Sequence, residues 1–311
     1  MIITVTLNPA IDKTVELNKL VQGGLNRLTN VISDVGGKGI NVSKTIKALG
    51  GETIATGFLG GSTGNLITKA LKEQGIPADF VEMKNEIRTN LKVVEPDGQV
   101  TELNEPGPIV AKEELDTLTK KLLAYATNET LFVLAGSIPG GIPMNSYQTL
   151  TQQLKEKGAR VFVDADGELF AHSLKAKPDM IKPNRHELEL YFHKDYRVGE
   201  EELIEMGREL VHQGISMAAI SLGQGGAFFF TKEKLLKCPG LKVEVHSTVG
   251  AGDAMVAALA YGFDLGLELE ACIKLGLATS AGAVTTTGTK PPGRELVDAL
   301  TKQVEVIPLP L

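Results

Sequence analysis

The sequence is poor in the features that mark membrane proteins, disulfide-stabilised domains and nucleic-acid-binding proteins. Its two cysteines, Cys238 and Cys272, follow no metal-binding spacing, which favours buried thiols over a disulfide or a zinc site. The most apolar stretch, 254–267, is interrupted by glycines and Asp264 and is too short to cross a bilayer. The formal net charge of −6 gives no general attraction to nucleic acid or to an anionic membrane. We therefore expect a cytoplasmic protein that binds any anionic ligand in a local basic pocket.

Short apolar runs alternate with longer amphipathic stretches along most of the 311 residues. Several of the longer stretches end at a glycine, where a helix commonly stops. The alternation predicts a mainly parallel sheet covered by helices, in a single α/β domain over residues 1–311. The expected strands are 2–7, 53–59, 131–135, 161–164, 180–182, 218–222, 227–231 and 242–246. The expected helices are 41–49, 65–73, 112–125, 147–156, 184–192, 200–212, 251–264, 269–284 and 293–301.

Two segments between the α/β units alternate apolar and polar residues with period two. They are 12–34 and 89–104, and the second contains Pro96-Asp97-Gly98, a typical hairpin turn. We expect them to form a small β-sheet flap, made of about 12–34 and 88–105. One face of such a flap needs a partner, which predicts a lid over a site or a dimer contact. The alternative is an edge hairpin that only packs.

The stretch 247–262 contains Gly250-Ala251-Gly252 followed by Asp253 and an apolar helix. The start of a helix has unpaired N–H groups and a partial positive charge, and glycines let an anion approach the backbone closely. The stretch therefore predicts an anion site formed by residues 250–252. Asp253 would ionise readily and accept a proton from a hydroxyl that attacks a phosphoryl group. The alternative is an acidic residue that only favours the helix dipole.

The stretch 36–41, GGKGIN, also combines glycines with the start of a helix. Its backbone can approach a ligand, Lys38 can reach a charged group, and Asn41 can cap the helix or bind a sugar hydroxyl. The alternative is an ordinary glycine-rich turn with a solvent-facing lysine. The sequence contains neither a Walker A loop nor a G-x-G-x-x-G fingerprint that opens a helix, and this weakens the case for a dinucleotide site.

Two further stretches follow expected strands. In the first, Asn184 is a good N-cap with Glu187 as its capping-box partner, and both are also candidates to face a site that holds phosphate or Mg²⁺-bound water. The second, SLGQGG at 221–226, fits either a simple hairpin or the floor of a nucleotide pocket.

With Asn8-Pro9-Ala10-Ile11-Asp12, these stretches resemble, in order and spacing, the ribokinase-like (PfkB) carbohydrate kinases over essentially the whole chain. The resemblance implies a three-layer α/β/α fold and Mg²⁺·ATP-dependent phosphorylation of a sugar hydroxymethyl. It also implies a flap that covers the sugar and commonly forms a homodimer. Asp253 matches the family's catalytic base, residues 250–252 its anion hole, and Glu187 a ligand of Mg²⁺ through water. The implied nucleotide-binding residues are Lys182, Asn184, Ser221, Gly223, Gly225, Gly226 and Thr248. The implied substrate-binding residues are Asp12, Gly37, Lys38, Gly39, Asn41, Arg88, Arg27, Asn104 and Ser137.

One departure points to a branch of this family. Ser247-Thr248 replaces the usual Asp-Thr pair, as in the branch that acts on hexose phosphates, the 1-phosphofructokinases and tagatose-6-phosphate kinases. Asn26-Arg27, Arg88 and the stretch 104–108, NEPGP, resemble the same branch. The expected reaction converts fructose 1-phosphate to fructose 1,6-bisphosphate, and the alternative substrate is tagatose 6-phosphate. The substrate's own phosphate needs fixed cations, for which Lys38, Arg88 and Arg27 are candidates.

Two other classes of protein share this type of sheet. A non-catalytic sugar-phosphate or nucleotide-binding regulator has no need of the base at Asp253. A nicotinamide oxidoreductase would carry a glycine fingerprint after the first strand, where Asn8-Pro9 stands instead.

Overall fold

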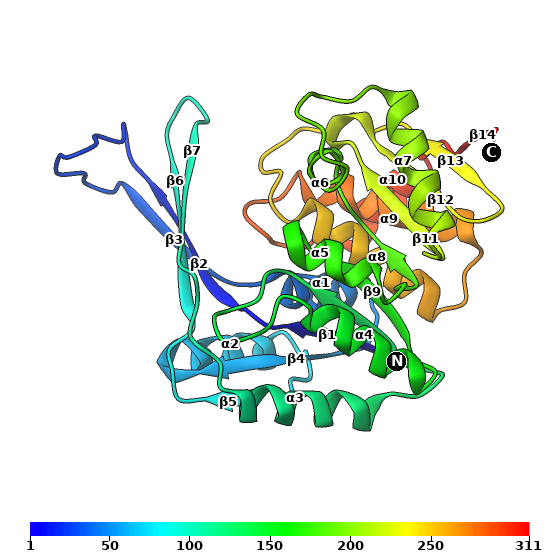
Figure 1. Ribbon diagram of the computed structural model, residues 1–311. Coiled ribbons are helices and arrows are strands. Elements are labelled where there is room, and N and C mark those ends of the chain that lie inside the picture. The colour runs from blue at the N-terminus through cyan, green and yellow to red at the C-terminus, as the bar shows by residue number, and fades with distance from the viewer. Residues whose placement is uncertain (311) are drawn as a thin grey trace.

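A computed structural model describes residues 1–310 and contains a ten-stranded sheet with a separate four-stranded sheet beside it (Figure 1). The large sheet has the order β14-β13-β12-β11-β10-β9-β8-β1-β4-β5. All neighbours from β11 to β5 are parallel, whereas β12, β13 and β14 continue the edge as antiparallel strands. The strands are β1 Ile2–Thr6, β4 Thr53–Gly60, β5 Val81–Met83, β8 Leu131–Ala135, β9 Arg160–Asp164, β10 Met180–Ile181, β11 Met217–Ser221, β12 Ala227–Phe230, β13 Leu235–Cys238 and β14 Ile307–Leu309.

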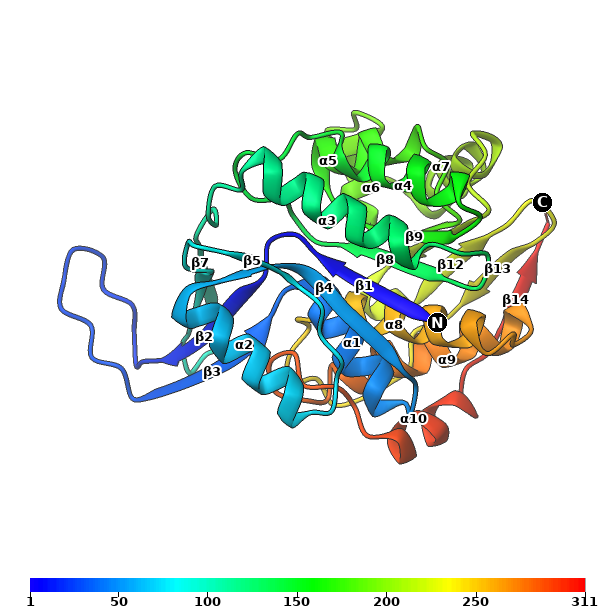
Figure 2. The same cartoon turned by 90° about the horizontal axis from the view of Figure 1, so that it is seen from below.

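Helices cover both faces of the large sheet and give three layers, as Figure 2 shows, with α3 to α7 on one face and α1, α8, α9 and α10 on the other. The central strands are therefore buried on both faces, which explains why they are continuous apolar runs. The helices are α1 Lys38–Ala48, α2 Gly61–Glu73, α3 Lys112–Tyr125, α4 Ser146–Glu156, α5 Gly167–Leu174, α6 Arg185–Tyr191, α7 Glu200–His212, α8 Ala251–Asp264, α9 Leu269–Ala283 and α10 Arg294–Thr301.

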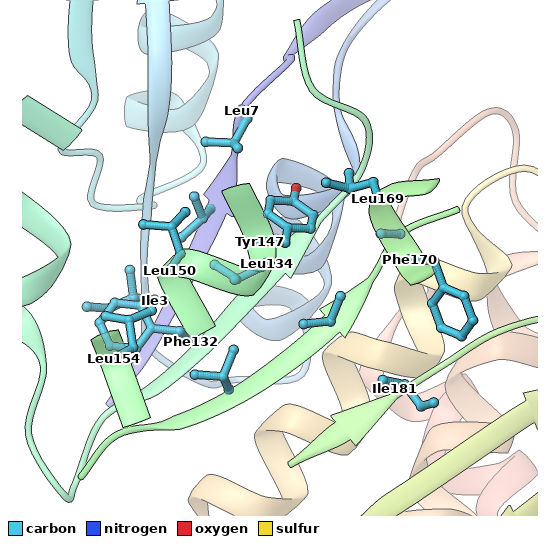
Figure 3. Close-up of a cluster of buried hydrophobic side chains, with 14 of the residues drawn as sticks. Ile3, Leu7, Phe132, Leu134, Tyr147, Leu150, Leu154, Leu169, Phe170 and Ile181 are labelled. Atoms are coloured by element: carbon cyan, nitrogen blue, oxygen red, sulfur yellow. The ribbon is translucent and has the colours of Figure 1, made fainter. Parts of the chain in front are cut away.

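Alternate residues of the central strands β8, β9 and β11 belong to different cores. In β8, Phe132 and Leu134 pack in the core beneath α4, while Leu131 and Val133 pack in the core shared with α8 and α9. Figure 3 shows the first of these cores, where Tyr147, Leu150 and Leu154 of α4 point toward Ile3, Phe132 and Leu134. Each such fully buried side chain contributes about 1.5–3 kcal/mol. The two cores hold the strand ends that carry the site in fixed positions.

The predicted flap is present as a four-stranded sheet of order β3-β2-β6-β7. Its strands are β2 Ala10–Glu16, β3 Asn30–Gly36, β6 Arg88–Val94 and β7 Val100–Asn104. The hairpin between β6 and β7 turns at Pro96-Asp97-Gly98 as predicted, with the Gly98 amide donating to Glu95 O. The prediction of a flap strand is wrong for residues 17–29, which form a long loop between β2 and β3 that projects from the body (Figure 1).

The two faces of the flap differ in chemistry. Paired residues share a face, so Asp12, Asn90 and Asn104 lie together, with Lys92 and Glu102 beside them. These five residues line the main cavity of the protein. The other face is apolar, and its exposed members, Val31 and Leu103, are 51% and 56% accessible. The same face also carries Val15, Leu91 and Val93, with Ile11 and Val35 packed in the core of the body and the pair Lys13 and Ser33 between them and Val31.

One expected strand is absent. Residues 242–246 alternate as a strand would, but they form an irregular loop after β13. Val243 and Val245 line the main cavity instead of pairing with a neighbouring strand. Conversely, the structure contains helix and strand elements that the sequence did not predict: α5, β5, β13 and β14. Cys238 and Cys272 are buried free thiols, as expected, and no helix in residues 1–310 has the length and apolarity to span a membrane.

Candidate active site

A cavity of about 950 Å³ lies where the carboxyl ends of β9, β10 and β11 meet the first turns of α1 and α8 and the polar face of the flap. In open parallel sheets, ligands bind at this end of the strands. Most of the residues that the sequence predicted line it: Asp12, Gly37, Lys38, Asn41, Arg88, Asn104, Lys182, Asn184, Glu187, Ser221, Gly223, Gly226, Thr248, Gly250, Ala251, Gly252 and Asp253. Segments far apart in the sequence therefore form one site.

The first turn of α8 has the geometry expected of an anion site. Gly250, which precedes the helix, has φ 81° and ψ −6°, a left-handed conformation that a side chain would strain. A Cβ on Gly252 would lie 3.1 Å from the Lys182 Nζ, so the glycine leaves room between the helix and an ammonium group. A phosphate oxygen fits such a space, where backbone N–H groups and a cation converge.

Asp253 is buried in this first turn, with 7% of its surface exposed. Its Oδ2 accepts a hydrogen bond of 2.8 Å from Asn41 Nδ2. Burial, with the charge of Asp164, raises the pKa of Asp253 to about 6, against the influence of Lys38, Asn41 and Lys182. This carboxyl is therefore harder to ionise than the sequence predicts, because burial and Asp164 outweigh the lysines and Asn41, but a pKa of about 6 leaves it mainly ionised at neutral pH.

Two lysines converge on a carboxylate that the sequence analysis did not select. Asp164, at the end of β9, is 1% exposed, and its Oδ1 lies 3.1 Å from Lys38 Nζ and 3.7 Å from Lys182 Nζ. Burial opposes its charge, but the two lysines outweigh burial and lower the pKa of Asp164. Burial likewise opposes the charge of Lys38, but Asp164, Asp253 and Glu187 raise its pKa. Lys38 therefore remains cationic at the Asp253 end of the cavity, and Lys182 lies beside the same carboxylate.

Asn184 and Glu187 form the capping box at the start of α6. Asn184 Oδ1 accepts from the Glu187 amide over 2.9 Å, and Glu187 Oε2 accepts from the Asn184 amide over 2.8 Å. Both residues also line the cavity, so the structural and the functional interpretation are compatible. Burial raises the pKa of Glu187, which leaves a partly desolvated carboxyl beside Lys182.

The flap end of the cavity carries a second group of polar side chains. Asp12 Oδ1 accepts a hydrogen bond from Asn90 Nδ2 over 3.0 Å. Arg88 donates to the carbonyl oxygens of Asn8 and Glu105, each over 3.1 Å, and its buried Nε has no partner within residues 1–310. Burial lowers the pKa of Arg88, but a guanidinium stays charged at neutral pH. This end offers carboxylate, amide and guanidinium groups to a polar ligand.

Four of the predicted residues lie outside the cavity. Gly39 faces β1, where a Cβ would collide with the Thr6 hydroxyl, so this glycine lets α1 pack on the strand. Gly225 forms the turn between β11 and β12. Ser137 is exposed and accepts a hydrogen bond from Asn8 over 3.3 Å. Arg27 is exposed in the projecting loop 17–29 and reaches no cavity residue of its own chain.

Several lining residues were missed by the sequence analysis. Asp164 ends an apolar strand and Asn90 alternates with Leu91 in the flap, so both carried a recognisable pattern. Residues 242–246, which the sequence analysis assigned to a strand, form a loop that supplies Val243 and Val245, and Leu241 lies directly before them. Together with Leu277 of α9 and Val284 directly after that helix, these give the cavity an apolar lining of the kind that holds a nucleotide base.

Comparison with known proteins defines the class. The pfkB family of carbohydrate kinases matches residues 5–295, and the chain therefore belongs to this family of phosphotransferases. Among its relatives, the 1-phosphofructokinase of Borreliella burgdorferi is 37% identical over 92% of this chain and 91% of its own. The D-tagatose-1-phosphate kinase of Bacillus licheniformis is 32% identical over 92% of each chain. A crystal structure of phosphofructokinase-2 from Escherichia coli in complex with substrates and products has a TM-score of 0.92 at 28% identity, covering 97% of this chain and 98% of that chain.

These findings confirm the resemblance inferred from the sequence and the ribokinase-like fold. They also decide against the oxidoreductase, because the family is one of kinases.

Proposed function

We propose that the chain phosphorylates a ketohexose phosphate with ATP at its free terminal hydroxymethyl, and that this substrate is fructose 1-phosphate. The observation that carries the proposal is that one cavity is lined both by Asp253, in the first turn of α8, and by Arg88, at the start of the flap strand β6. A base and a guanidinium so arranged suit a sugar with a hydroxymethyl at one end and a phosphate at the other. Relatives named 1-phosphofructokinase, at 32–37% identity over most of the chain, support it.

The residues at the start of α8 fit the triphosphate of ATP. The space kept open by Gly252 next to Lys182 admits a phosphate oxygen, and Lys38 adds a second cation. The apolar lining with Leu241 and Val243 suits the base. Glu187 would hold Mg²⁺ through water, because a buried carboxyl next to phosphate oxygens matches the oxygen ligands that this ion prefers. When bound, Mg²⁺ would neutralise negative charge on the transferring phosphoryl group.

Asp253 takes the proton from the hydroxymethyl as its oxygen attacks. A general base works best when its pKa is near the working pH, and the raised pKa of Asp253, about 6, approaches that condition. Asn41 holds the carboxylate in position by its hydrogen bond to Oδ2. The backbone N–H groups after Gly250, with Lys38 and Lys182, stabilise the negative charge that develops on the phosphoryl group. The flap closes the sugar end and excludes water.

A second candidate substrate is tagatose 1-phosphate, because one relative is named D-tagatose-1-phosphate kinase. This sugar differs from fructose 1-phosphate only in configuration at C4, so its phosphate and its reacting hydroxymethyl keep their places. In tagatose 6-phosphate, the alternative inferred from the sequence, the phosphate and the free hydroxymethyl are at exchanged ends of the sugar.

We further infer a homodimer through the flap. Its apolar face, with Val31 and Leu103 exposed, is typical of a surface that another subunit covers. In such an assembly the loop with Arg27 extends beyond its own subunit, so Arg27 would reach a substrate phosphate only in the partner's site.

A coupled ADP-release assay over fructose, fructose 1-phosphate, fructose 6-phosphate and both tagatose monophosphates tests the proposed substrate. The proposal predicts the highest kcat/KM with fructose 1-phosphate. A higher value with a 6-phosphate, or with unphosphorylated fructose, would reject it.

A further inference from the structure

The start of α2 binds a carboxylate of the same chain. Glu86 lies in the segment between β5 and β6, and its two carboxylate oxygens contact two successive residues of the helix. Oε1 accepts hydrogen bonds of 2.9 Å from both the amide and the hydroxyl of Ser62. Oε2 accepts from the amide of Thr63 over 2.9 Å and from its hydroxyl over 2.7 Å. One exposed carboxylate thus satisfies two unpaired amides of the first helical turn.

The next residue of the segment is attached to the same helical turn. The Ile87 amide donates to Thr63 Oγ1 over 2.8 Å, and the Ile87 side chain is buried, with 3% exposed. Two neighbouring residues, Glu86 and Ile87, are therefore held at the start of α2. We refer to these contacts of Glu86 and Ile87 with Ser62 and Thr63 as the α2 clamp.

Two glycines make room for this contact. A Cβ on Gly60 would collide with the Met83 and Asn85 carbonyl oxygens, and one on Gly61 would collide with the Glu86 carboxylate. Gly61 also has φ 64°, in the region that disfavours side chains. The stretch 59–64, LGGSTG, is thus shaped to receive the segment that ends at Glu86. None of the clamp residues lines the active-site cavity.

The clamp lies next to Arg88 in the sequence and therefore affects the active site. Arg88 follows Ile87 directly and begins β6, which continues through Asn90 to the hydrogen bond with Asp12. Whatever fixes Ile87 therefore fixes the backbone from which Arg88 reaches into the cavity. The Arg88 guanidinium is held only by two carbonyl oxygens among residues 1–310, so its placement depends on this backbone.

We propose that Glu86 is a positioning residue for the sugar-phosphate site: through the α2 clamp it holds the start of β6 where Arg88 meets the substrate's own phosphate. This inference rests on the proposed function. The electrostatics agree with it, because hydrogen bonds from Thr63 and Ser62 lower the pKa of Glu86 to about 2. The carboxylate therefore remains charged at any pH at which the enzyme works, and a helix N-terminus favours that charge.

The test compares Glu86→Ala with a control, Glu82→Gln, which alters an exposed acidic residue of the preceding strand β5. A second pair, Thr63→Val and Thr63→Ser, removes or keeps the hydroxyl that bonds Glu86 and Ile87. We expect Glu86→Ala and Thr63→Val to lower kcat/KM for fructose 1-phosphate about 2- to 30-fold, the effect of losing a helix-capping contact. The loss should appear in KM, while kcat, the KM for ATP, and turnover of unphosphorylated fructose change less than about twofold.

Amide hydrogen exchange of residues 84–90 gives a readout that needs no substrate. Exchange should accelerate in Glu86→Ala and Thr63→Val and stay normal in Thr63→Ser and Glu82→Gln. Faster exchange with equal losses on fructose and fructose 1-phosphate would overturn the positioning role, and so would unchanged exchange. If the unmodified enzyme prefers another sugar phosphate, the proposal of fructose 1-phosphate as substrate is rejected. The variants are then compared on that sugar phosphate and its unphosphorylated form, and the same criteria decide whether Glu86 is a positioning residue.

Discussion

Asn41 and Asp253 are 212 positions apart in the sequence and are joined by a hydrogen bond of 2.8 Å. The bond connects the first turns of α1 and α8, and so the two glycine-rich stretches GGKGIN and TVGAGD. It uses only the amide NH₂ of Asn41, whose buried Oδ1 has no partner among residues 1–310. Asn41 can therefore accept a hydrogen bond from a sugar hydroxyl while it orients the carboxylate that we propose as the base.

The raised pKa of Asp253 predicts the pH dependence of the reaction. The base must be ionised, and burial together with Asp164 raises its pKa to about 6. The logarithm of kcat/KM for the sugar should therefore rise with slope one up to about pH 6 and level off above it. An unperturbed aspartate would place this limb near pH 4. Initial rates between pH 4.5 and 8 distinguish the two cases, and a flat profile over that range would contradict the assignment.

Gly252 should be sensitive to a single methyl group. A Cβ there would lie 3.1 Å from Lys182 Nζ and 3.2 Å from Cε, so Gly252→Ala displaces the lysine and fills the space assigned to a phosphate oxygen. Losing one charge-assisted contact costs about 1.5–3 kcal/mol, which is about 10- to 150-fold in kcat/KM for ATP. Gly293→Ala is the control, because a Cβ there meets nothing within 4 Å. A normal kcat/KM for ATP in Gly252→Ala would mean that no phosphate oxygen of ATP occupies this space.

Arg88 should discriminate between phosphorylated and unphosphorylated sugars. If its guanidinium holds the substrate's own phosphate, Arg88→Ala loses about 10- to 150-fold in kcat/KM with fructose 1-phosphate. Fructose never makes that contact and should lose much less. Steady-state kinetics on both sugars are the measurement. Equal losses would mean that Arg88 only supports Asn8 and Glu105, whose carbonyl oxygens it binds.

If the chain dimerises through the flap, a single charged substitution on the apolar face of the flap should weaken the dimer. Val31 and Val100 are equally exposed, at 51% and 52%, but Val31 pairs with Val15 on the apolar face and Val100 pairs with Val94 on the polar face. Val31→Lys buries an unpaired charge at the proposed interface and should weaken the dimer at least tenfold, about 1.4 kcal/mol or more. Val100→Lys should not. Sedimentation at micromolar concentration decides, and a fully active monomeric wild type would refute the dimer.

The elements that depend on local pattern could be predicted from the sequence. The bounds of α3, α7 and α8 match the prediction, because helical spacing and flanking glycines are local properties. The segment 242–246 has an equally clear alternation but forms no strand. Whether an alternating segment joins a sheet depends on a free strand edge beside it, which the sequence does not specify.

The site was predictable only as separate stretches. Asp253 and Asn41 were each identifiable from glycines before a helix, but their hydrogen bond depends on how α1 packs against α8. Asp164 is recognisable in the sequence only as the end of an apolar strand, and its importance comes from the meeting of β9 with Lys38 and Lys182. Tertiary burial also makes Asp253 harder to ionise than its place at a helix start predicts, since desolvation cannot be judged from a helix start alone.

The most direct test of the account is kcat for Asp253→Asn with ATP and the preferred ketohexose phosphate, measured alongside the melting temperature. Removing a general base loses about 10²- to 10⁴-fold in rate. Because the raised pKa means that the folded state binds the proton more tightly than the unfolded state, ionisation at neutral pH costs stability. The neutral Asn variant should therefore melt at the same temperature as the wild type or higher at pH 8. A near-normal kcat in this folded variant would contradict the central claim that Asp253 is the base.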